Sequence, residues 1–375
     1  MQDSKYCHNT KSVNKVGIIT NYANTNYGSI LQSYALQQAL KSLGIRCENI
    51  QWSVNKKPSL LYRTARAGYR IIADSLSAPR RRVERFKQFR QKYIQESKKS
   101  YSSIEELAVT NTIYDAFICG SDQIWAPNQF HERYYLGFAG DDKLKIAYAP
   151  SIGLPKIPET LAPRMADLIK RIDHLSIREE EGARIVKSLT GRNAEVVLDP
   201  TLLLNKNEWL KVAADMPQRK KYILCYFLGE NNRHRKAAES WSKKTGLPLV
   251  VLPFRDIDFK WGNIRIADAG PDIFLSLVDG AQWILTDSYH GMIFSIIMNK
   301  PFSVFMRFTE DHPLCQNSRI KHLLNRLGLM NRIVTGDTID VNYDDMPDYK
   351  MINEIISKER TTSICYLKNA LGISS

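Results

Sequence analysis

A chain of 375 residues with 43% hydrophobic side chains can bury the cores of two ordinary domains, which excludes a small module or a disordered protein. The polar start 1–14 lacks the apolar core of a signal peptide and no run of about 18 apolar residues occurs, so we expect a cytosolic protein that does not span a membrane. The six cysteines form no C-x-x-C pair, which predicts reduced thiols without disulfides or a zinc knuckle.

The chain begins with a strand, a polar loop and a helix. Residues 15–20 predict the strand, 21–29 the loop, and 30–43 a helix with a broad apolar face that ends at Gly44. The order is that of a Rossmann-like unit, but the G-x-G-x-x-G fingerprint is missing, so a dinucleotide is not favoured. Side chains around the helix start are suited to a polyhydroxylated ligand, although a plain tight turn explains Asn and Gly equally well. The candidates are Asn26, Tyr27, Gly28, Ser29 and Gln32.

Most of the formal charge of +14 lies in one segment. Residues 56–99 hold fourteen basic and three acidic side chains, a net +11, within two helical patterns at 61–76 and 83–93. A basic amphipathic helix pair is typical of an element that binds an anionic membrane surface, and a solvated face of packed helices is the alternative. Aromatic and basic side chains do not recur elsewhere as a base-stacking platform, so nucleic acid is not expected as a partner.

Two strands of the first half end in polar side chains. The apolar strand 114–119 runs into Gly120, and Asp122 and Gln123 follow at its carboxyl end. A later strand, 174–177, ends at Arg178. Ligands of open α/β sheets bind at this edge, although a capping role for Asp122 stays open. Further strands are predicted at 145–149 and 195–198, and helices at 159–171 and 179–189.

A second alternation of strands and helices follows the turn-rich stretch 202–219. Its strands are predicted at 222–228, 249–252, 283–286 and 303–306, and two of its helices at 233–244 and 271–279. The order βαβαβ in each half predicts an α/β fold of two facing Rossmann-like domains with a cleft between their carboxyl edges. We expect an N-terminal domain at 1–204 with a basic insertion at 56–99, a linker at 205–219, a C-terminal domain at 220–345, and a C-terminal helix in 346–375 that packs back on the first domain.

The stretch 283–302, WILTDSYHGMIFSIIMNKPF, predicts a strand, a turn and a buried helix. Asp287 and Ser288 are helix N-cap residues, which places His290 in the first helical turn. A helix N-terminus attracts an anion, and a histidine beside it can move a proton near neutral pH. A hydrogen-bonded structural histidine is the common alternative.

Six blocks of the chain, in this order, resemble the polysaccharide pyruvyl transferase family, and they span nearly its whole length. They are NYGSILQSYALQQALKSLG at 26–44, YDAFICGSDQIW at 114–125, LSIREEEG at 175–182, LDPTLLL at 198–204, TDSYHGMIFSIIMNKPF at 286–302 and NSRIKHLLNRLGL at 317–329.

The resemblance implies a fold similar to the two-domain GT-B glycosyltransferase architecture. It also implies transfer of a pyruvyl group from phosphoenolpyruvate to a sugar as a cyclic ketal, with release of phosphate and without a metal or other cofactor. The acceptor is then expected to be a lipid-linked precursor of a polysaccharide repeat, reached at the inner face of the cytoplasmic membrane.

The family's donor-site residues carry over onto matching positions of this sequence. The family histidine corresponds to His290 and an arginine of its middle block to Arg178, while Asp122 is our candidate for binding or deprotonating the acceptor, so these three form the catalytic set. Some members have an arginine where this chain has Ser288, which leaves one anion contact to be assigned. The full donor set is Arg178, Ser288, His290, Gly291, Arg307 and Arg319, and Gln123 joins the acceptor set of Asn26, Tyr27, Gly28, Gln32 and Asp122.

Two other functions stay open at this point. A GT-B glycosyltransferase that uses a nucleotide sugar would share the architecture. A membrane-associated partner in glycan assembly without catalysis would use only the basic segment.

Overall fold

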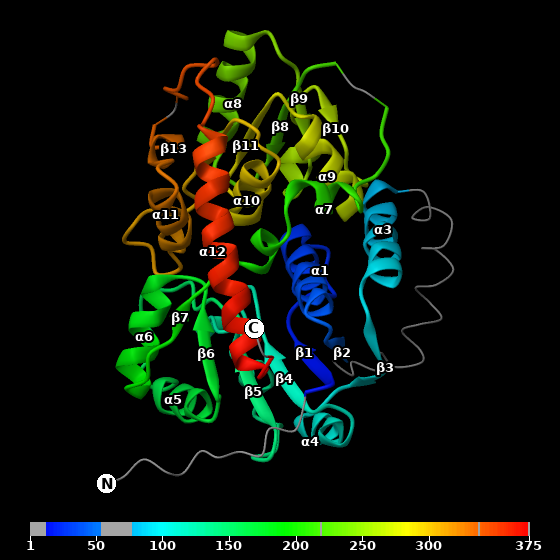
Figure 1. Cartoon of the computed structure of the whole chain (residues 1–375). Coiled ribbons are helices and arrows are strands. Elements are labelled where there is room, and N and C mark those ends of the chain that lie inside the picture. The colour runs from blue at the N-terminus through cyan, green and yellow to red at the C-terminus, as the bar shows by residue number, and fades with distance from the viewer. Residues whose placement is uncertain (1–12, 54–76, 218–219, 337, 374–375) are drawn as a thin grey trace, which may run out of the picture.

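The structure is a computed structural model that describes residues 13–53, 77–217, 220–336 and 338–373. Within these ranges the strands form two sheets, and the paired strands run parallel. Their orders are β3-β2-β1-β4-β5-β6-β7 in the first domain and β10-β9-β8-β11-β12-β13 in the second, with helices packed around both (Figure 1). The predicted α/β fold with two Rossmann-like domains is confirmed.

The first domain consists of the strands of the first sheet and the helices around them. Its strands are β1 (Lys15–Ile19), β2 (Arg46–Trp52), β3 (Glu96–Tyr101), β4 (Ala116–Cys119), β5 (Leu144–Ala147), β6 (His174–Ile177) and β7 (Glu195–Val196). Its α-helices are α1 (Tyr27–Ser42), α3 (Ala78–Tyr93), α4 (Ile104–Ala108), α5 (Ala162–Lys170) and α6 (Glu180–Thr190). Its short 3-10 helices are η1 (Val109–Thr112), η2 (Pro127–Gln129), η3 (Glu132–Tyr135) and η4 (Pro200–Leu203).

The second domain repeats the alternation after a short connection. Its strands are β8 (Ile223–Tyr226), β9 (Leu249–Val251), β10 (Ile264–Arg265), β11 (Trp283–Thr286), β12 (Phe302–Phe305) and β13 (Ile333–Val334). The α-helices from the connection onward are α7 (Lys206–Leu210), α8 (Asn232–Thr245), α9 (Pro271–Gly280), α10 (Tyr289–Ile297), α11 (Asn317–Arg326) and α12 (Tyr349–Ala370), and the 3-10 helices are η5 (Asp256–Phe259) and η6 (Met330–Arg332).

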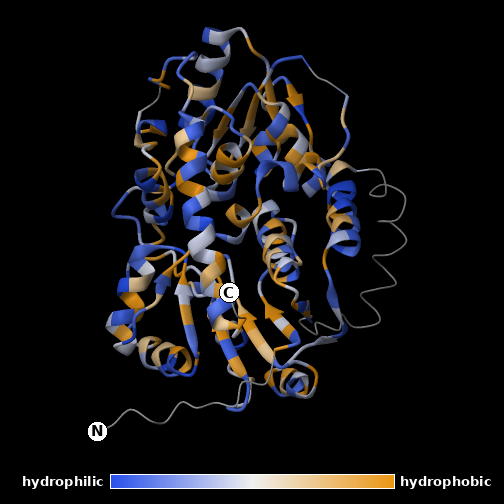
Figure 2. Cartoon of the chain, in the orientation of Figure 1, coloured by the Kyte–Doolittle hydropathy of each residue, from blue (hydrophilic) through white to orange (hydrophobic). Residues whose placement is uncertain are grey.

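The central strands are buried along their whole length because helices cover both faces of each sheet. Strands β4, β8, β11 and β12 have no exposed residue, and their side chains are apolar except at Tyr226, Thr286 and Ser303. Orange segments of the hydropathy view accordingly lie in the interior of both domains (Figure 2). Parallel pairing brings the carboxyl ends of neighbouring strands to one edge of each sheet. The loops after β4, β6, β7 and β11 therefore carry their polar side chains to these edges.

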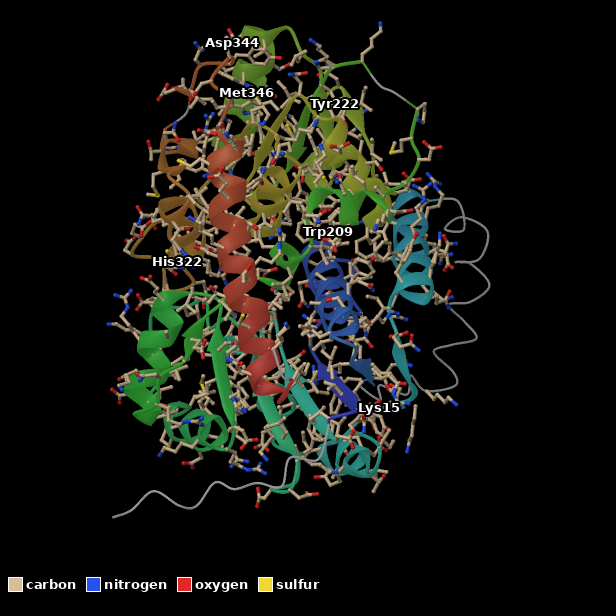
Figure 3. The ribbon with its side chains drawn as sticks, in the orientation of Figure 1. Lys15, Trp209, Tyr222, His322, Asp344 and Met346 are labelled. Carbon is tan, nitrogen blue, oxygen red and sulfur yellow. The ribbon has the colours of Figure 1, made fainter. Side chains whose placement is uncertain are left out.

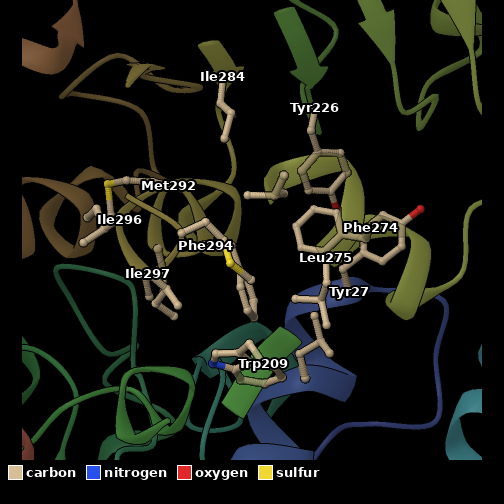
Figure 4. Close-up of a cluster of buried hydrophobic side chains, with 14 of the residues drawn as sticks. Tyr27, Trp209, Tyr226, Phe274, Leu275, Ile284, Met292, Phe294, Ile296 and Ile297 are labelled. Carbon is tan, nitrogen blue, oxygen red and sulfur yellow. The ribbon is translucent and has the colours of Figure 1, made fainter. Parts of the chain in front are cut away.

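Helix α1 packs against both domains and is therefore buried on nearly every side. Tyr27 in its first turn stacks on Phe274 of α9 at 4.5 Å between ring centroids, and its hydroxyl donates to the carbonyl of Ala269. Lower on the same helix, Tyr34 packs on Trp209, which in turn contacts Phe294 of α10. One hydrophobic core thus runs from the first domain into the second (Figure 4), and Trp209 lies between the two domains (Figure 3).

Helix α12 crosses from the second domain back to the first, as the red helix of Figure 1 shows. Ile352 and Ile356 near its start pack in the core shared by the domains. Near its end, Tyr366 packs among β1, β4 and β5 and donates a hydrogen bond to the carbonyl of Ala147. The chain therefore passes between the domains twice.

Part of the basic segment, residues 56–76 with the helix predicted at 61–76, lies outside the described residues. The rest includes α3, a mostly hydrophilic helix that packs beside α1 through Phe86 and Phe89 (Figure 2). Arg82 donates to the carbonyl of Pro253, while Arg81 and Arg85 bind Asp268. Side chains considered for a membrane surface are thus used in the contact between the domains.

The described residues contain no helix that is long and apolar enough to cross a membrane. All five cysteines within the described ranges are free thiols, and Cys365 alone among these five is exposed.

We predict that Trp209→Ala lowers the free energy of unfolding by about 3–5 kcal/mol, because it empties a fully buried indole site between the domains. Chemical denaturation measures the loss. Trp261→Ala is the matched control, because Trp261 is half-buried within the second domain, and a smaller loss is expected there. Because the core is shared, wild-type protein should show one calorimetric transition, and two separate transitions would contradict this account.

Candidate active site

His290 lies in the first turn of α10, at the carboxyl end of β11, as its sequence predicts. Ser288 is the N-cap, and its hydroxyl accepts a hydrogen bond from the amide of Gly291. A Cβ on Gly291 would lie 2.4 Å from Oγ1 of Thr286, so only glycine permits this close turn. Ser288 and Gly291 therefore build the helix start that holds the histidine.

The imidazole of His290 reaches across to the first domain and rests on Gly28 of α1. A Cβ added at Gly28 would lie 2.0 Å from Nδ1 of His290, so the absence of a side chain is what admits the ring. The histidine is only 7% exposed. Gly28, a candidate for acceptor binding, is thus first of all the surface on which His290 packs.

Asp199 connects His290 to Arg178 in a buried contact between the domains. Its Oδ2 atom lies 2.6 Å from Nη1 of Arg178 and 3.5 Å from Nε2 of His290. Its Oδ1 atom accepts hydrogen bonds from the amide and hydroxyl of Thr201. The carboxylate follows β7 and Arg178 follows β6, so adjacent strands of the first sheet supply both groups.

Charge holds Asp199 in its ionised form. Burial alone would raise the pKa of this carboxyl, but His290 and Arg178 reverse the effect and hold the pKa well below its usual range. The folded pKa is depressed, so the contact contributes its full stability at neutral pH. That contribution declines as the pH falls below about 4, where the unfolded chain takes up a proton.

Three arginines form a cationic cluster next to the histidine. The ring of Tyr289 lies between Arg178 and Arg319, with guanidinium carbons 4.4 and 5.2 Å from its centroid. Burial, together with Arg178 and Arg307, lowers the pKa of Arg319 to about 10. Among the described residues neither Arg307 nor Arg319 forms an ion pair with a carboxylate, and Nε and Nη2 of Arg178 have no hydrogen-bond partner. The cluster therefore has positive charge available for an anion.

A polar pocket of about 180 Å³ opens at the start of α1. Its lining consists almost wholly of amide, hydroxyl and carboxylate side chains: Asn21, Asn24, Asn26, Ser29, Asp122, Gln123, Ile124 and Gln129. Asp122 accepts a 2.7 Å hydrogen bond from the hydroxyl of Ser29 and adopts a left-handed φ of +66° that Asp tolerates better than most residues. Nε2 of Gln123 is buried and has no partner in the described part of the chain. Of the predicted acceptor residues, Asn26, Asp122 and Gln123 come together here.

Two of the predicted acceptor residues, Tyr27 and Gln32, are not part of the pocket lining. Tyr27 is buried in the core between the domains, as described above. Gln32 is fully buried, donates to Thr20 and to the carbonyl of Ser29, and accepts from the amide of Ser121. It ties the loop after β4 to α1 and so supports the pocket from behind.

The sequence patterns did not single out Asp199 or Glu179. Glu179 is buried beside Arg178, and its Oε1 accepts from Ser151 and from the amides of Ile152 and Gly153. The available signal was position, because both carboxylates directly follow strands whose carboxyl ends meet at the site. Within the described ranges, the site included, no group of three or more His, Cys, Asp or Glu side chains is arranged to hold a metal ion.

The chain is similar to known proteins in its sequence and in its fold. The family model described as polysaccharide pyruvyl transferase matches residues 26–307. No curated protein sequence matches the chain.

Solved structures of similar architecture include sugar-nucleotide epimerases. A structure of S. aureus MnaA with UDP has a TM-score of 0.53 at 12% identity, covering 96% of this chain and 98% of that chain. The UDP-GlcNAc 2-epimerase of Neisseria meningitidis, bound to UDP-GlcNAc, has a TM-score of 0.50 at 12% identity, covering 95% and 94%. The enzyme of Methanocaldococcus jannaschii, with UDP-GlcNAc and UDP, has 0.50 at 14%, covering 92% and 99%. At such identities the likeness shows the fold alone, which is of the GT-B type.

We predict that Gly28→Ala destabilises the protein by about 1–3 kcal/mol, because the new methyl group overlaps the His290 ring. Helix propensity by itself would favour alanine by about 1 kcal/mol, so the sign of the change tests the contact. Thermal and chemical unfolding measure it. Gly336→Ala is the control, because its Cβ would meet open space, and a change within about 0.5 kcal/mol is expected. A stabilised Gly28→Ala variant would show that the ring does not rest on this glycine.

Proposed function

The chain belongs to the polysaccharide pyruvyl transferase family, and on this basis we propose that it transfers a pyruvyl group from phosphoenolpyruvate to a sugar. The product is a cyclic ketal that bridges two hydroxyl groups, and inorganic phosphate is released. Family membership supports a transferase of polysaccharide synthesis, and the site chemistry supports the choice of donor.

The observation that carries the choice of donor is the unpaired positive charge beside His290. Phosphoenolpyruvate has a phosphate and a carboxylate on one carbon, so it needs several cationic donors in a small space. Arg178 is paired with Asp199 through Nη1 and lies 3.8 Å from Glu179 through Nε, but its Nε and Nη2 form no hydrogen bond in the described part of the chain. Arg319 is buried and Arg307 half-buried, and neither forms an ion pair with a carboxylate of the described residues. A buried guanidinium group without a carboxylate partner is costly unless an anion binds to it. We propose that these arginines bind the donor and that no metal ion or other cofactor takes part.

The reaction requires a proton at one carbon of the donor and a nucleophile at the next. His290 donates a proton to C3 of the enol, which leaves C2 electron-poor. A sugar hydroxyl bonds to C2 and gives its proton to a base, and the C2–O bond to phosphate breaks with its electron pair while that proton passes to the phosphate. The second hydroxyl then bonds to C2 and closes the ring, and its proton returns to the imidazole of His290. Arginines that already surround the phosphate stabilise the leaving group.

The polar pocket at the start of α1 is proposed as the acceptor site. Its amides can donate and accept hydrogen bonds, as recognition of a polyhydroxylated sugar requires. Asp122 is the only ionisable side chain in the lining, which makes it the candidate base for the attacking hydroxyl. Ser29 orients this carboxylate through its hydrogen bond.

The acceptor is proposed to be a lipid-linked repeat precursor, met at the inner face of the cytoplasmic membrane. A protein with a net charge of +14 is attracted to anionic headgroups, each basic residue near the surface contributing about 1 kcal/mol. Because Arg81, Arg82 and Arg85 contact the second domain, a test of membrane binding should vary exposed residues such as Lys98 and Lys99 instead.

A nucleotide-sugar glycosyltransferase is the second candidate, favoured by the structural likeness to proteins solved with UDP or UDP-GlcNAc. The two candidate functions differ in the donor that the protein binds. Phosphoenolpyruvate should stabilise the pyruvyl transferase, and UDP should stabilise the glycosyltransferase.

We predict that His290→Gln lowers the rate of transfer by about 10²- to 10⁴-fold, the usual contribution of a general acid or base. Phosphate release from phosphoenolpyruvate in the presence of acceptor measures the rate. His174→Gln is the control, because His174 lies at the opposite, amino end of β6. A folded His290→Gln enzyme within about threefold of wild type would remove the histidine from the mechanism.

We also predict that Arg319→Met abolishes the thermal stabilisation by phosphoenolpyruvate but leaves the unliganded protein as stable as wild type or more so. The arginine is buried among like charges, so its removal relieves repulsion. At a donor concentration of 100 times Kd, wild type should gain about 2.7 kcal/mol. Arg332→Met is the matched control, because Arg332 is equally buried but paired with Asp345. This control should lose stability and keep its response to the donor, and the same pattern in Arg319→Met would argue against the proposed anion site.

A further inference from the structure

The two carboxylate oxygens of Asp199 contact different groups. Oδ1 is used within its own turn, where it accepts from the amide of Thr201 at 3.0 Å and from the hydroxyl at 2.7 Å. This fixes the plane of the carboxylate and leaves Oδ2 2.6 Å from Nη1 of Arg178 and 3.5 Å from Nε2 of His290. Nε2 is buried and forms no hydrogen bond in the described part of the chain, so Oδ2 is the acceptor within reach of its proton. The group is 1% exposed, so water does not compete for it.

The two nitrogens of the His290 ring also face different groups. Nε2 lies on the side of Asp199, while Nδ1 lies over Gly28. Gly28 is in the first turn of α1, between Asn26 and Ser29, and both of these residues line the polar pocket. Nδ1 is therefore the ring nitrogen that faces the first turn of α1, although neither His290 nor Gly28 is part of the pocket lining.

We propose that Asp199 is a positioning residue, which accepts the Nε2 proton of His290 and so leaves Nδ1 as the nitrogen that exchanges protons with the substrate. A histidine ring has two neutral forms, and the partner of one nitrogen decides which form is present. An ionised carboxylate can only accept, so it selects the form with the proton on Nε2. The inference rests on the proposed function in one point: the proton that Nδ1 exchanges is the proton delivered to C3 of the donor.

The proton balance follows from this arrangement. In the charged ring both nitrogens carry protons; Nδ1 gives its proton to C3, and the ring becomes neutral with the remaining proton on Nε2. The second sugar hydroxyl gives its proton to Nδ1 as it closes the ring, which restores the charged form. Asp199 stays ionised throughout, because Arg178 and the charged ring both favour its anion.

A purely structural role for Asp199 is the competing explanation, since its contact with Arg178 alone accounts for a buried carboxylate. The two explanations differ in one observable. Loss of a structural ion pair lowers stability, whereas loss of a positioning residue also changes which nitrogen of His290 carries the proton.

The test is nitrogen NMR of protein labelled with ¹⁵N at the histidine rings, at a pH where His290 is neutral and without substrate. The signals of His290 are assigned as those missing in His290→Gln. Wild type should show the proton on Nε2, and Asp199→Asn should shift the ring toward the Nδ1-protonated form. The turnover number of Asp199→Asn should fall by about 10²- to 10⁴-fold, by more than the donor KM rises.

Asp258→Asn is the matched control. Asp258 is 1% exposed and pairs with buried Arg235 at 2.6 Å, but it contacts neither His290 nor Arg178. It should lose stability without changing the His290 signals. If Asp199→Asn does not fold, Thr201→Val removes one of the two hydrogen bonds that orient Asp199 and should shift the same signals by a smaller amount.

A wild-type ring protonated on Nδ1, or an unchanged ring in a folded Asp199→Asn or Thr201→Val variant, would overturn the proposal. Because the NMR measurement uses no substrate, it is independent of the transfer reaction. A protein whose ring follows Asp199 but which does not react with phosphoenolpyruvate would refute the proposed function and leave the positioning role standing.

Discussion

The packing of Tyr27 against the second domain is the interaction on which the site depends. Its ring stacks on Phe274 and its hydroxyl donates to the carbonyl of Ala269, so the first turn of α1 is held against the start of α9 in the second domain. Gly28 follows directly in the chain and receives the His290 ring. This aromatic contact helps to bring together the edges of the two sheets, where a histidine of one domain meets a carboxylate of the other.

Sequence periodicity was enough to predict most of the two Rossmann-like domains, because buried parallel strands are continuous apolar runs. Strands β2 and β3 were not predicted, and the reason is physical. RCENIQW and ESKKSY carry polar and charged side chains, and β3 lies at the edge of its sheet, where one side faces water. Helix α1 was expected to begin at 30 but begins at Tyr27, because Asn26 caps it.

The site was predictable where one residue signals its own chemistry and not where function comes from distant contacts. His290 follows a strand and starts a helix, and Arg178 ends a strand, so position alone pointed to both. Asp199 precedes a proline and has the pattern of an ordinary turn residue; its contacts with Arg178 and His290 exist only in the folded chain. For Tyr27 and Gln32 the pattern was ambiguous, and burial decided in favour of packing.

The return of α12 to the first domain has a consequence for how the chain folds during synthesis. The core around β1, β4 and β5 includes Tyr366, Leu367 and Ala370, which the ribosome adds only after the second domain. The first domain is therefore made long before its own core can be completed, and its apolar surface stays uncovered while the second domain emerges. Such long-range contacts slow folding, and they tie the stability of the earliest segment to the latest one.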